Sequence, residues 1–340
     1  MRTRTGLVLG KFMPVHQGHL ELIDFGRTHC ERLVVLVCAN PNEPIPGPLR
    51  LAWVRQILAG RPGVEVHYTG ADLPDAPYAS RPVSKAWADY LTRRFPEVSV
   101  IFTSEPYGDY VAEYMNIEHR LFDQPRQRVP VSATLIRNDP FRYWAFIPAV
   151  VRPYYVKKIC LYGPESTGKS TLAEQLALRF QTTFVPEAAR TILRSSLECT
   201  YEDLTTIAVT QAEWTQRQVA TANKLLFCDT GLLTTQVYAQ YLFGRVPAFE
   251  PWIVEANRYD FYLFLDSDVP YVQDGTRLGA TTRPPLREAF WLALQNARVD
   301  YAIITGSWEA RFGKAVKAVE ERFGPETGGS DLPPFPPVAK

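Results

Sequence analysis

The chain has 340 residues, of which 46% are hydrophobic, and a formal net charge of +1 at pH 7. This length suggests two domains, and the near-zero charge disfavours a broad electrostatic surface for nucleic acid. The five cysteines show no CxxC spacing, so we expect free thiols in a reducing cytoplasm. The sequence shows neither a signal peptide nor an apolar run of the ~20 residues that a membrane span requires. We therefore expect a cytoplasmic protein; its oligomeric state stays open, a homo-oligomer included.

Apolar runs and helix-like segments alternate in the first half of the chain. The expected strands are Gly6–Leu9, Leu33–Ala39, Val64–Tyr68 and Val98–Phe102, and the expected helices are Gly18–His29, Leu49–Leu58 and Val83–Phe95. Such alternation predicts right-handed βαβ crossovers and a parallel sheet. We expect an α/β domain of the Rossmann-like kind.

A second alternation follows the aromatic and proline-rich residues 141–155. Its expected strands are KKICLY at Lys157–Tyr162, Leu225–Cys228, Phe261–Leu265 and Tyr301–Ile304, with a helix from Lys169. This pattern predicts a second α/β domain with a parallel sheet. We expect domains at 1–153 and 154–324, followed by a tail at 325–340 that is too rich in proline and glycine for regular structure.

The strongest motif is GPESTGKST at Gly163–Thr171, which matches G-x-x-x-x-G-K-[ST] between a strand and an amphipathic helix. In such a loop the backbone N–H groups point at phosphate oxygens, Lys169 reaches the β and γ phosphates, and the Ser170 hydroxyl can bind Mg²⁺. The predicted ATP-binding residues are Gly163, Glu165, Ser166, Thr167, Gly168, Lys169, Ser170 and Thr171. The motif predicts a P-loop kinase domain.

Three further stretches of the second half are typical of phosphoryl transfer. Asp229 ends an apolar strand, where a carboxylate can meet Mg²⁺ or the accepting hydroxyl. DGTRLGATTR at Asp274–Arg283 is a candidate lid whose arginines neutralise the transferring group, and EAAR at Glu187–Arg190 is a candidate contact to the acceptor. The alternatives are a strand-end turn, a solvated loop and a helix surface pair.

The stretch GKFMPVHQGH at Gly10–His19 places two of the five histidines three residues apart at an expected helix start. We expect His16 and His19 to face the crevice at the carboxyl end of the first strand, where open α/β sheets bind ligands. Two imidazoles with helix amides can stabilise charge that develops on an α-phosphate, and Gly18 allows a nucleotide to approach the backbone. A zinc pair is disfavoured because no third ligand lies nearby. Two structural histidines are the other alternative.

A second anion-binding motif comes late in the same domain. In VSATLIR at Val131–Arg137, Ser132 and Thr134 supply hydroxyls at an expected helix start, and Arg137 follows one turn later. Alone, this pattern is also typical of an ordinary N-cap serine beside a surface arginine.

Together, HxGH and SxTxxR resemble the nucleotidyltransferase superfamily that joins an adenylyl group to a phosphate. With the Walker A loop behind them, the chain resembles the NadR-type family, in which nicotinamide-nucleotide adenylyltransferase is fused to ribosylnicotinamide kinase. The likeness runs from about Leu7 to about Phe323 and also includes TSEP at Thr103–Pro106, EAAR and DGTR. The uninterrupted join from VSATLIR into GPESTGKST is its most diagnostic part.

The resemblance implies two reactions and their small-molecule partners. The kinase would phosphorylate nicotinamide riboside with ATP to nicotinamide mononucleotide (NMN), and the adenylyltransferase would join NMN to a second ATP to give NAD and pyrophosphate. Its longer members carry an N-terminal helix-turn-helix repressor. Because only five residues precede Gly6, we expect no such domain and no DNA binding.

The resemblance also assigns roles to residues. Gly10, Lys11, Phe12, His16, Gly18 and His19 would meet ATP in the adenylyltransferase, with Ser132, Thr134 and Arg137 on its β and γ phosphates. In the kinase, Lys169 and Asp229 would be catalytic, Ser170 and Asp229 would hold Mg²⁺, and Glu187, Arg190, Asp274 and Arg277 would face the substrate. The lid reads YVQDGTR, where the family pattern has a tryptophan and a further acidic residue.

Two tryptophans are candidates for stacking on a nicotinamide or adenine ring. Trp87 and Trp53 both have the required flat face, and both also suit an apolar core.

Two alternatives remain at this stage. One is the same adenylyltransferase fused to a kinase for a different nucleoside. The other is a nucleotide sensor in which one domain has become weakly active.

Overall fold

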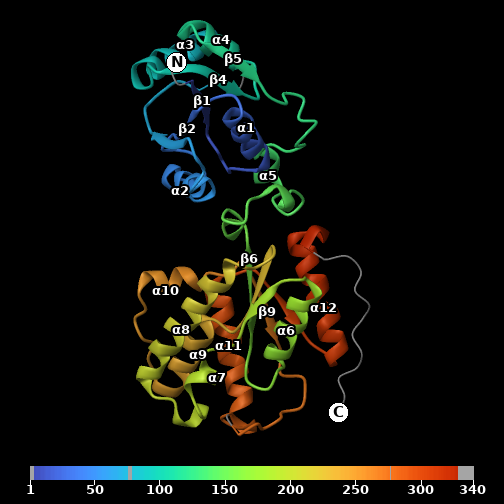
Figure 1. Cartoon of the computed structure of the whole chain (residues 1–340). Coiled ribbons are helices and arrows are strands. Elements are labelled where there is room, and N and C mark those ends of the chain that lie inside the picture. Colours follow the sequence, from blue (N-terminus) through green and yellow to red (C-terminus); the bar gives the residue numbers. More distant parts are fainter. Residues whose placement is uncertain (1–3, 76–78, 276, 328–340) are drawn as a thin grey trace. The chain divides into compact units, whose positions relative to one another are not determined.

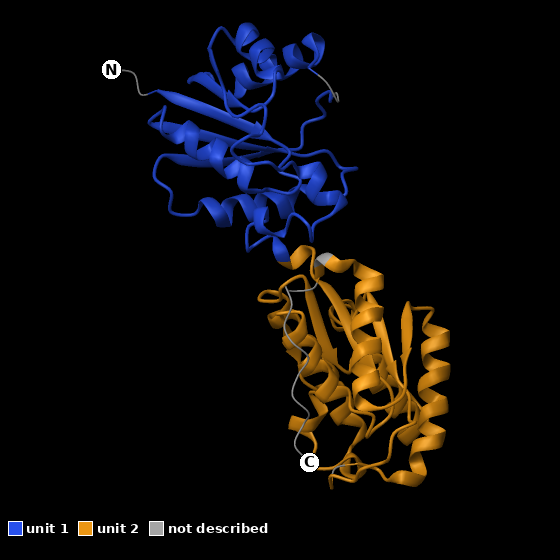
Figure 2. Cartoon of the chain, turned by 90° about the vertical axis from the view of Figure 1, so that its right-hand side faces the viewer, with its two compact units in different colours: residues 1–152 blue, residues 153–340 orange. Residues whose placement is uncertain are grey.

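The computed structural model of the chain describes residues 4–75, 79–275 and 277–327, and divides into two compact units. Unit 1 covers Met1–Arg152 and unit 2 covers Pro153–Lys340 (Figure 2). Of the expected C-terminal tail, Pro325–Thr327 forms the short 3-10 helix η5, and residues 328–340 lie outside the described residues. Within the described ranges no helix is long and apolar enough to cross a membrane.

The described part of unit 1 is built on a five-stranded parallel sheet of order β3-β2-β1-β4-β5 (Figure 1). Its strands are β1 (Thr5–Gly10), β2 (Arg32–Cys38), β3 (Val64–Thr69), β4 (Val98–Thr103) and β5 (Glu118–Leu121). The strand order reverses at β1, which pairs with β2 on one side and β4 on the other. Ligands of open parallel sheets bind at the carboxyl end of such a reversal.

Helices cover both faces of the unit 1 sheet. They are α1 (Gln17–Arg27), α2 (Gly47–Leu58), α3 (Arg81–Arg94), α4 (Tyr107–Met115) and α5 (Ala133–Asn138), with the 3-10 helices η1 (Trp144–Phe146) and η2 (Arg152–Tyr154) after them. α3 and α4 pack together over one face through Leu91 and Val111, and α1 and α2 lie on the other (Figure 1). Because both faces are covered, β2 is apolar and buried along almost its whole length.

Unit 2 repeats this architecture with another strand order, β10-β9-β6-β8-β7, for the strands that the structure describes there. The strands, all parallel, are β6 (Lys157–Tyr162), β7 (Thr183–Val185), β8 (Leu225–Asp229), β9 (Phe261–Leu265) and β10 (Tyr301–Ile304). The two parallel sheets confirm the predicted α/β fold class. The central strand β6 leads directly into the Walker A loop.

The helices of unit 2 also form two layers. They are α6 (Lys169–Arg179), α7 (Ala189–Ile192), α8 (Tyr201–Val219), α9 (Leu232–Phe243), α10 (Pro251–Ala256), α11 (Arg283–Ala297) and α12 (Trp308–Phe323), with η3 (Ser196–Glu198) and η4 (Ala280–Thr282) in loops. α6 and α12 pack together on one side of the sheet, and α9 and α11 on the other (Figure 1). Phe290 of α11 packs on Tyr162 of β6, with ring centroids 4.9 Å apart.

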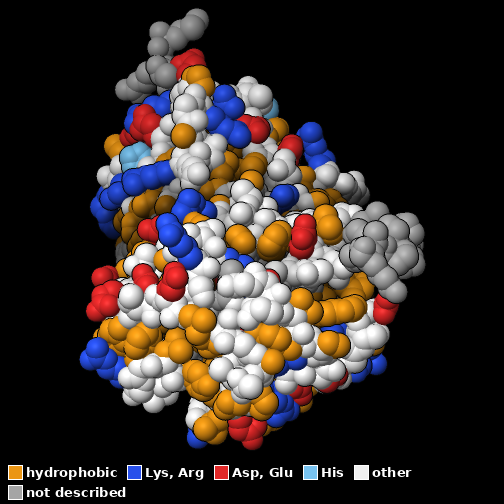
Figure 3. Space-filling view, turned by 90° about the horizontal axis from the view of Figure 1, so that it is seen from below, with side chains coloured by type: hydrophobic (Ala, Val, Ile, Leu, Met, Phe, Trp, Pro, Cys, Tyr) orange, Lys and Arg blue, Asp and Glu red, His pale blue; other side chains and the backbone are white. Residues whose placement is uncertain are grey.

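The surface carries no single-signed charge field on the face drawn in Figure 3, where Lys and Arg side chains are interspersed with Asp, Glu and apolar ones among the described residues. All five cysteines are free, and Cys38, Cys160 and Cys228 are buried in strands.

Candidate active sites

A cavity of about 660 Å³ lies in unit 1 and is lined by residues at the carboxyl ends of β1 and β4. Its lining includes most of the predicted adenylyltransferase residues, namely Gly10, Lys11, Phe12, His16, Gly18, His19, Thr134 and Arg137, together with Trp87. Ser132 is not part of the lining; it caps α5, where its hydroxyl accepts from the Leu135 N–H at 3.2 Å. The structure thus brings together segments more than 120 residues apart in sequence, because β1 and β4 are neighbours.

The two histidines lie at the start of α1, where backbone N–H groups of the same turn fix the orientation of both rings. His16 is the N-cap, and its Nδ1 accepts from the Gly18 N–H at 3.1 Å, while Nδ1 of His19 accepts from the His16 N–H at 3.3 Å. The ring centroids are 3.9 Å apart. A neutral imidazole that accepts at Nδ1 carries its proton on Nε2. Each ring therefore keeps one N–H to donate.

Burial keeps both rings neutral. It lowers the pKa of His19 to about 4, with a smaller contribution from the positive charge of Arg126. Burial also holds the pKa of His16 far below its ordinary value, aided by His19 and then Arg126. At neutral pH the pair is thus two oriented N–H donors without charge.

The position of the His16 ring explains why residue 18 is a glycine. A Cβ at this position would lie 3.0 Å from Cε1 and 3.1 Å from Nδ1 of His16. The absence of a side chain lets the backbone N–H reach the imidazole. The close approach seen in the structure is thus by a ring of the chain itself.

A buried arginine that the sequence analysis did not identify supports the turn after β1. Arg50 of α2 is fully buried and donates to the carbonyl oxygens of Lys11 at 2.6 Å and Cys38 at 3.1 Å. It also pairs with Glu43 at 2.5 Å, and Glu43 lies 3.0 Å from Nζ of Lys11. The arrangement fixes the backbone that presents Lys11 to the cavity.

Two residues of the predicted second anion-binding motif, Thr134 and Arg137, are connected to each other. Nη2 of Arg137 donates to Oγ1 of Thr134 at 3.0 Å, and Nη1 donates to the Met13 carbonyl at 2.5 Å. The second contact ties α5 to the loop that carries the histidines.

The two candidate stacking tryptophans are placed differently. Trp87 lines the unit 1 cavity and donates from Nε1 to the Pro74 carbonyl at 3.0 Å. Trp53 is 5% exposed and belongs to the core under α2. Only Trp87 remains a candidate for contact with a base.

A cavity of about 420 Å³ lies in unit 2, and residues 165–171 of the Walker A loop line it together with Glu187, Arg190 and Arg277. Gly163 and Gly168 have φ of +140° and +84°. A Cβ on Gly163 would lie 2.4 Å from the Leu265 carbonyl oxygen, and one on Gly168 would lie 2.2 Å from the Trp308 ring. The loop conformation thus requires glycine at both positions.

Lys169 is 9% exposed, and its Nζ donates to the Pro164 carbonyl at 2.9 Å. The ammonium group therefore curls over the loop and already points at the space that phosphates would fill.

Asp229, at the end of β8, is 1% exposed. Burial raises its pKa to about 6, with a further increase from the negative charge of Glu187; Lys169, a hydrogen bond from Ser170, and Arg190 oppose this. Its Oδ1 has no hydrogen-bond partner among the described residues. A buried, unpartnered carboxylate oxygen beside the Ser170 hydroxyl fits one ligand pair of Mg²⁺, whose other ligands are usually waters and substrate phosphates. No cluster of three or more potential metal-binding side chains occurs in residues 4–75, 79–275 and 277–327.

The predicted substrate residues come from two separate segments and form one chain of ion pairs. Arg190 lies 3.0 Å from Glu187 and 3.4 Å from Asp274, and Asp274 lies 2.9 Å from Arg277. The lid stretch is thus joined to the EAAR stretch at the cavity, as one would expect if both face the same ligand.

Glu165 connects the Walker A loop to two other loops. Its Oε1 accepts from the Ser196 hydroxyl at 2.9 Å, and its Oε2 accepts from the Leu278 N–H of the lid at 2.9 Å. Glu165 lines the cavity, so its predicted contact with ATP stays a prediction, and these contacts also make it a link between loop and lid.

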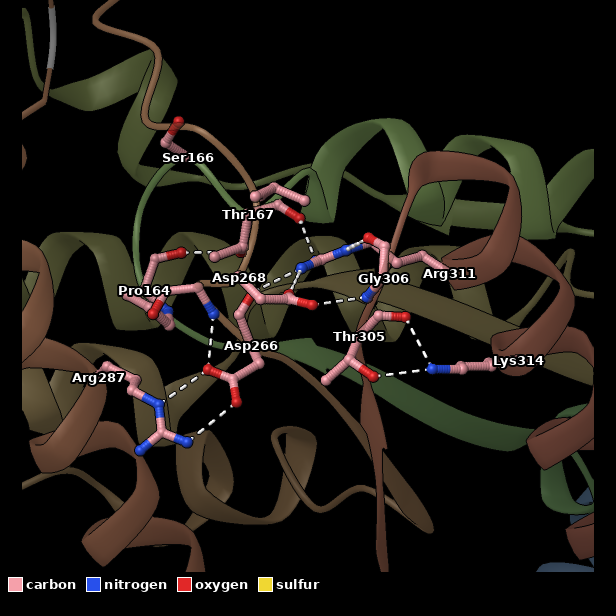
Figure 4. Close-up of polar contacts among 12 residues, drawn as sticks. Pro164, Ser166, Thr167, Asp266, Asp268, Arg287, Thr305, Gly306, Arg311 and Lys314 are labelled. Atoms are coloured by element: carbon pink, nitrogen blue, oxygen red, sulfur yellow. Dashed lines mark hydrogen bonds and ion pairs between the residues drawn. The ribbon is translucent and has the colours of Figure 1, made fainter.

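Arg311 of α12 is a second buried arginine that the sequence analysis did not identify (Figure 4). It donates to the carbonyl oxygens of Thr167 at 3.1 Å, Gly306 at 2.9 Å and Asp266 at 2.8 Å, and pairs with Asp268. One guanidinium thereby joins the Walker A loop to the ends of β9 and β10. Arginine suits four acceptors because its guanidinium carries five N–H donors in a fixed geometry.

The histidine pair generates the first prediction. In spectra of ¹⁵N-labelled histidine, we expect both rings to show the neutral form with the proton on Nε2 at pH 7. We expect His19 to titrate near pH 4, because burial opposes its charged form. The chain has five histidines, so His16→Asn and His19→Asn suffice to assign the two signals. Titration of either ring near the ordinary value of about 6.5 would contradict the assignment.

Arg311 generates the second prediction. We expect Arg311→Ala to lower the free energy of opening of unit 2 by about 3–5 kcal/mol, since it removes the donor of one buried and two part-buried carbonyl oxygens and the cationic partner of Asp268. Hydrogen exchange of β6 and β9 peptides measures this, with unit 1 peptides as internal reference. The matched control is Arg322→Ala on the same helix, where an exposed pair with Asp300 at 2.8 Å contributes at most about 1 kcal/mol. Equal effects of the two substitutions would refute the role of Arg311.

Comparison with known proteins places these sites in a family context. Residues 158–311 match a family model described as an AAA domain. The chain is 29% identical over 342 residues, 94% of its length and 83% of the relative's, to the trifunctional NAD biosynthesis/regulator protein NadR of Escherichia coli (strain K12), and equally to that of Salmonella typhimurium. A nicotinamide-nucleotide adenylyltransferase of Thermococcus onnurineus (strain NA1) is 25% identical over 141 residues, 40% of this chain and 71% of the relative.

Solved structures agree with this on the fold. A NadR protein crystallised with NR superimposes with a TM-score of 0.77 at 23% identity, over 95% of this chain and 96% of that one. A NadR complex with NAD and AMP-PNP gives a TM-score of 0.77 at 22% identity, over 95% of this chain and 97% of that one. These findings confirm the resemblance that the motifs indicate: the chain is similar to NadR over 94% of its length and shares the fold of solved NadR structures.

Proposed function

We propose that unit 2 phosphorylates nicotinamide riboside with ATP to NMN, and that unit 1 joins NMN to the adenylyl group of a second ATP, giving NAD and pyrophosphate. The observation that carries this proposal is the presence of two separate cavities, one in each unit and each lined by a motif typical of phosphate binding, in a chain similar to NadR over 94% of its length. A protein with one nucleotide reaction would need only one of them.

In unit 2 the riboside hydroxyl would attack the γ-phosphorus of ATP. The new O–P bond forms as the bond to the β–γ bridging oxygen breaks, and ADP leaves with that electron pair. The hydroxyl proton passes to a carboxylate of the pair Asp229 and Glu187, in which burial and then the negative charge of Glu187 raise the pKa of Asp229. Lys169 and the loop N–H groups hold the phosphates in line.

Ser170 and Asp229 would hold Mg²⁺, which when bound supplies charge neutralisation at the β and γ phosphates. Arg190 and Arg277 line the same cavity and would bind the transferring phosphoryl group or the riboside from the lid side. Their carboxylate partners Glu187 and Asp274 keep both guanidinium groups oriented.

In unit 1 an NMN phosphate oxygen would attack the α-phosphorus of ATP, and pyrophosphate would leave with the electrons of the α–β bond. No protein nucleophile is needed, because the substrate's own phosphate is the nucleophile. The Nε2–H groups of His16 and His19 would donate to the α-phosphate as negative charge develops on it. Thr134 and Arg137 would bind the departing pyrophosphate.

A product assay tests both reactions. Purified protein with Mg²⁺, ATP and nicotinamide riboside is expected to form NMN and NAD, resolved by chromatography. We expect Lys169→Ala to make neither product from riboside, with kcat reduced ~100-fold or more, yet to convert added NMN into NAD. We expect His19→Asn to stop at NMN. Each variant thus serves as the folding control for the other unit.

The outcome that refutes the proposal is the absence of both products while ATP still binds. If the wild-type chain forms NMN but no NAD, the proposed kinase reaction is supported and the proposed adenylyltransferase reaction is refuted. Activity on another nucleoside in place of the riboside would keep the kinase and correct its substrate.

The raised pKa of Asp229 predicts a pH dependence of the kinase alone. In the enzyme without Mg²⁺ the carboxylate is protonated below about pH 6 and must lose its proton before it can pair with the ion, so kcat/KM of the kinase for Mg²⁺-bound ATP is expected to rise with pH through about 6. NAD formation from added NMN in the same samples should lack this step. A flat kinase profile between pH 5 and 7, or Asp229→Asn with wild-type activity, would exclude this role.

A further inference from the structure

The unit 1 cavity poses a charge problem for a polyphosphate ligand. His16 and His19 are neutral at pH 7, so they donate hydrogen bonds but add no positive charge. ATP brings several negative charges into this space. Among the described lining residues, the cationic ones are Lys11, Arg126 and Arg137. The charge that binds the ligand must therefore come largely from these three side chains.

Two of the three cations are already engaged in the structure. Nζ of Lys11 lies 3.0 Å from Glu43 and 2.5 Å from Asp75. Arg137 donates to the Met13 carbonyl and to Thr134. These contacts orient both side chains and, for Lys11, offset its charge.

Arg126 is in a different situation. Its guanidinium is 44% exposed, and the ionic contact that the structure gives it, to Glu105, is long at 3.6 Å. Glu105 lines the same cavity and is itself 59% exposed. Such a contact can be exchanged for phosphate oxygens at small cost, since exposed pairs contribute about 0–1 kcal/mol.

The backbone around Arg126 is built to hold it there. The Asp123 carboxylate accepts from the N–H groups of Gln127 at 2.9 Å, Arg128 at 3.1 Å and Val129 at 3.3 Å. Asp123 and Arg126 both have left-handed backbone, with φ of +43° and +52°. Non-glycine residues in this region cost about 1–2 kcal/mol each, so the carboxylate compensates a strained turn. The turn directs Arg126 into the cavity.

The positive charge of the Arg126 guanidinium also affects the two histidines. Arg126 contributes to the lowered pKa of His16 and of His19, and all three residues line the same cavity. A phosphate chain bound in this cavity could meet both the imidazole N–H groups and the guanidinium.

We propose that Arg126 binds the polyphosphate of ATP in unit 1, exchanging its long contact with Glu105 for phosphate oxygens. This inference rests on the proposed adenylyl transfer and adds to it a catalytic residue outside both sequence motifs. Bidentate donation by a guanidinium would stabilise pyrophosphate as it leaves and supply charge that the neutral histidines lack.

The chain offers a matched control in the same turn. Arg128 lies two residues further on, but its guanidinium stacks over the Phe122 ring at 5.4 Å and is not part of the described cavity lining. Its backbone N–H, which bonds to Asp123, stays in Arg128→Ala. Arg126→Ala and Arg128→Ala thus remove the same side chain from the same loop, and only the first faces the ligand.

The test compares Arg126→Ala, Arg126→Gln, Arg126→Lys and Arg128→Ala in NAD formation from NMN and ATP. For Arg126→Ala we expect kcat/KM for ATP to fall about 10- to 1000-fold, the range for loss of one charge-stabilising donor, with KM for NMN nearly unchanged. Arg126→Gln should behave like alanine, and lysine should retain part of the activity because it keeps the charge. Inhibition by pyrophosphate should weaken in parallel. Arg128→Ala, and the kinase activity of every variant, should match wild type.

Wild-type kcat/KM for ATP in Arg126→Ala, or an equal loss in Arg128→Ala, would overturn the proposal. If the wild-type chain forms no NAD from NMN and ATP, it is the proposed function that fails. Calorimetric titration of the same variants with pyrophosphate then still tests whether Arg126 binds a polyphosphate. Weaker binding only in Arg126→Ala and Arg126→Gln supports the inference, and unchanged binding refutes it.

Discussion

Both sites depend on the same feature of the backbone: a central parallel strand ends at the carboxyl edge of its sheet, and a helix begins just after it. The first N–H groups of such a helix have no partner within the helix, and they carry the positive end of its dipole. β1 enters α1 and β6 enters α6 in this way. The turns satisfy the free N–H groups differently. His16 caps α1 with its ring, whereas Gly168 caps α6 in left-handed conformation and leaves the loop N–H groups available to a ligand.

This difference accounts for the distribution of charge in the two units. In unit 2 the anion-binding N–H groups come with Lys169, a cation held against the loop carbonyl of Pro164. In unit 1 the caps are imidazoles that burial keeps neutral, so the cations must come from other elements, such as Arg137 of α5. In the proposed function, the carboxyl edges of the two sheets would thus support two chemistries: transfer of a terminal phosphoryl group in unit 2, and attack at an α-phosphate in unit 1.

The sequence predicted what depends on local patterns. The central strands, the Walker A loop and the histidine turn all have apolar periodicity or fixed spacing, and the structure places them as expected. The sequence pattern did not predict the edge strand β5, because its sequence EHRL contains only one apolar residue. One apolar residue suffices for a strand exposed at the sheet margin. The roles of Arg50 and Arg311 were not predicted from the sequence for another reason. Each lies in an ordinary helical stretch, and only the fold shows that carbonyl groups from distant loops converge on it.

Burial and hydrogen bonding together separate the structural arginines from those that face a ligand. Arg50 and Arg311 are 0% and 1% exposed and donate to carbonyl oxygens at 2.6–3.1 Å, so moving either one would leave buried acceptors unsatisfied. Arg126 and Arg190 line cavities, pair with carboxylates at 3.0–3.6 Å and keep 44–45% of their side chains exposed. A guanidinium of the first kind fixes a loop, because it is buried and donates to loop carbonyl oxygens. A guanidinium of the second kind can turn from a carboxylate to a phosphate, because one anion replaces another. The buried arginines thus fix the loops, and the exposed ones on those cavity walls remain free to follow the ligand.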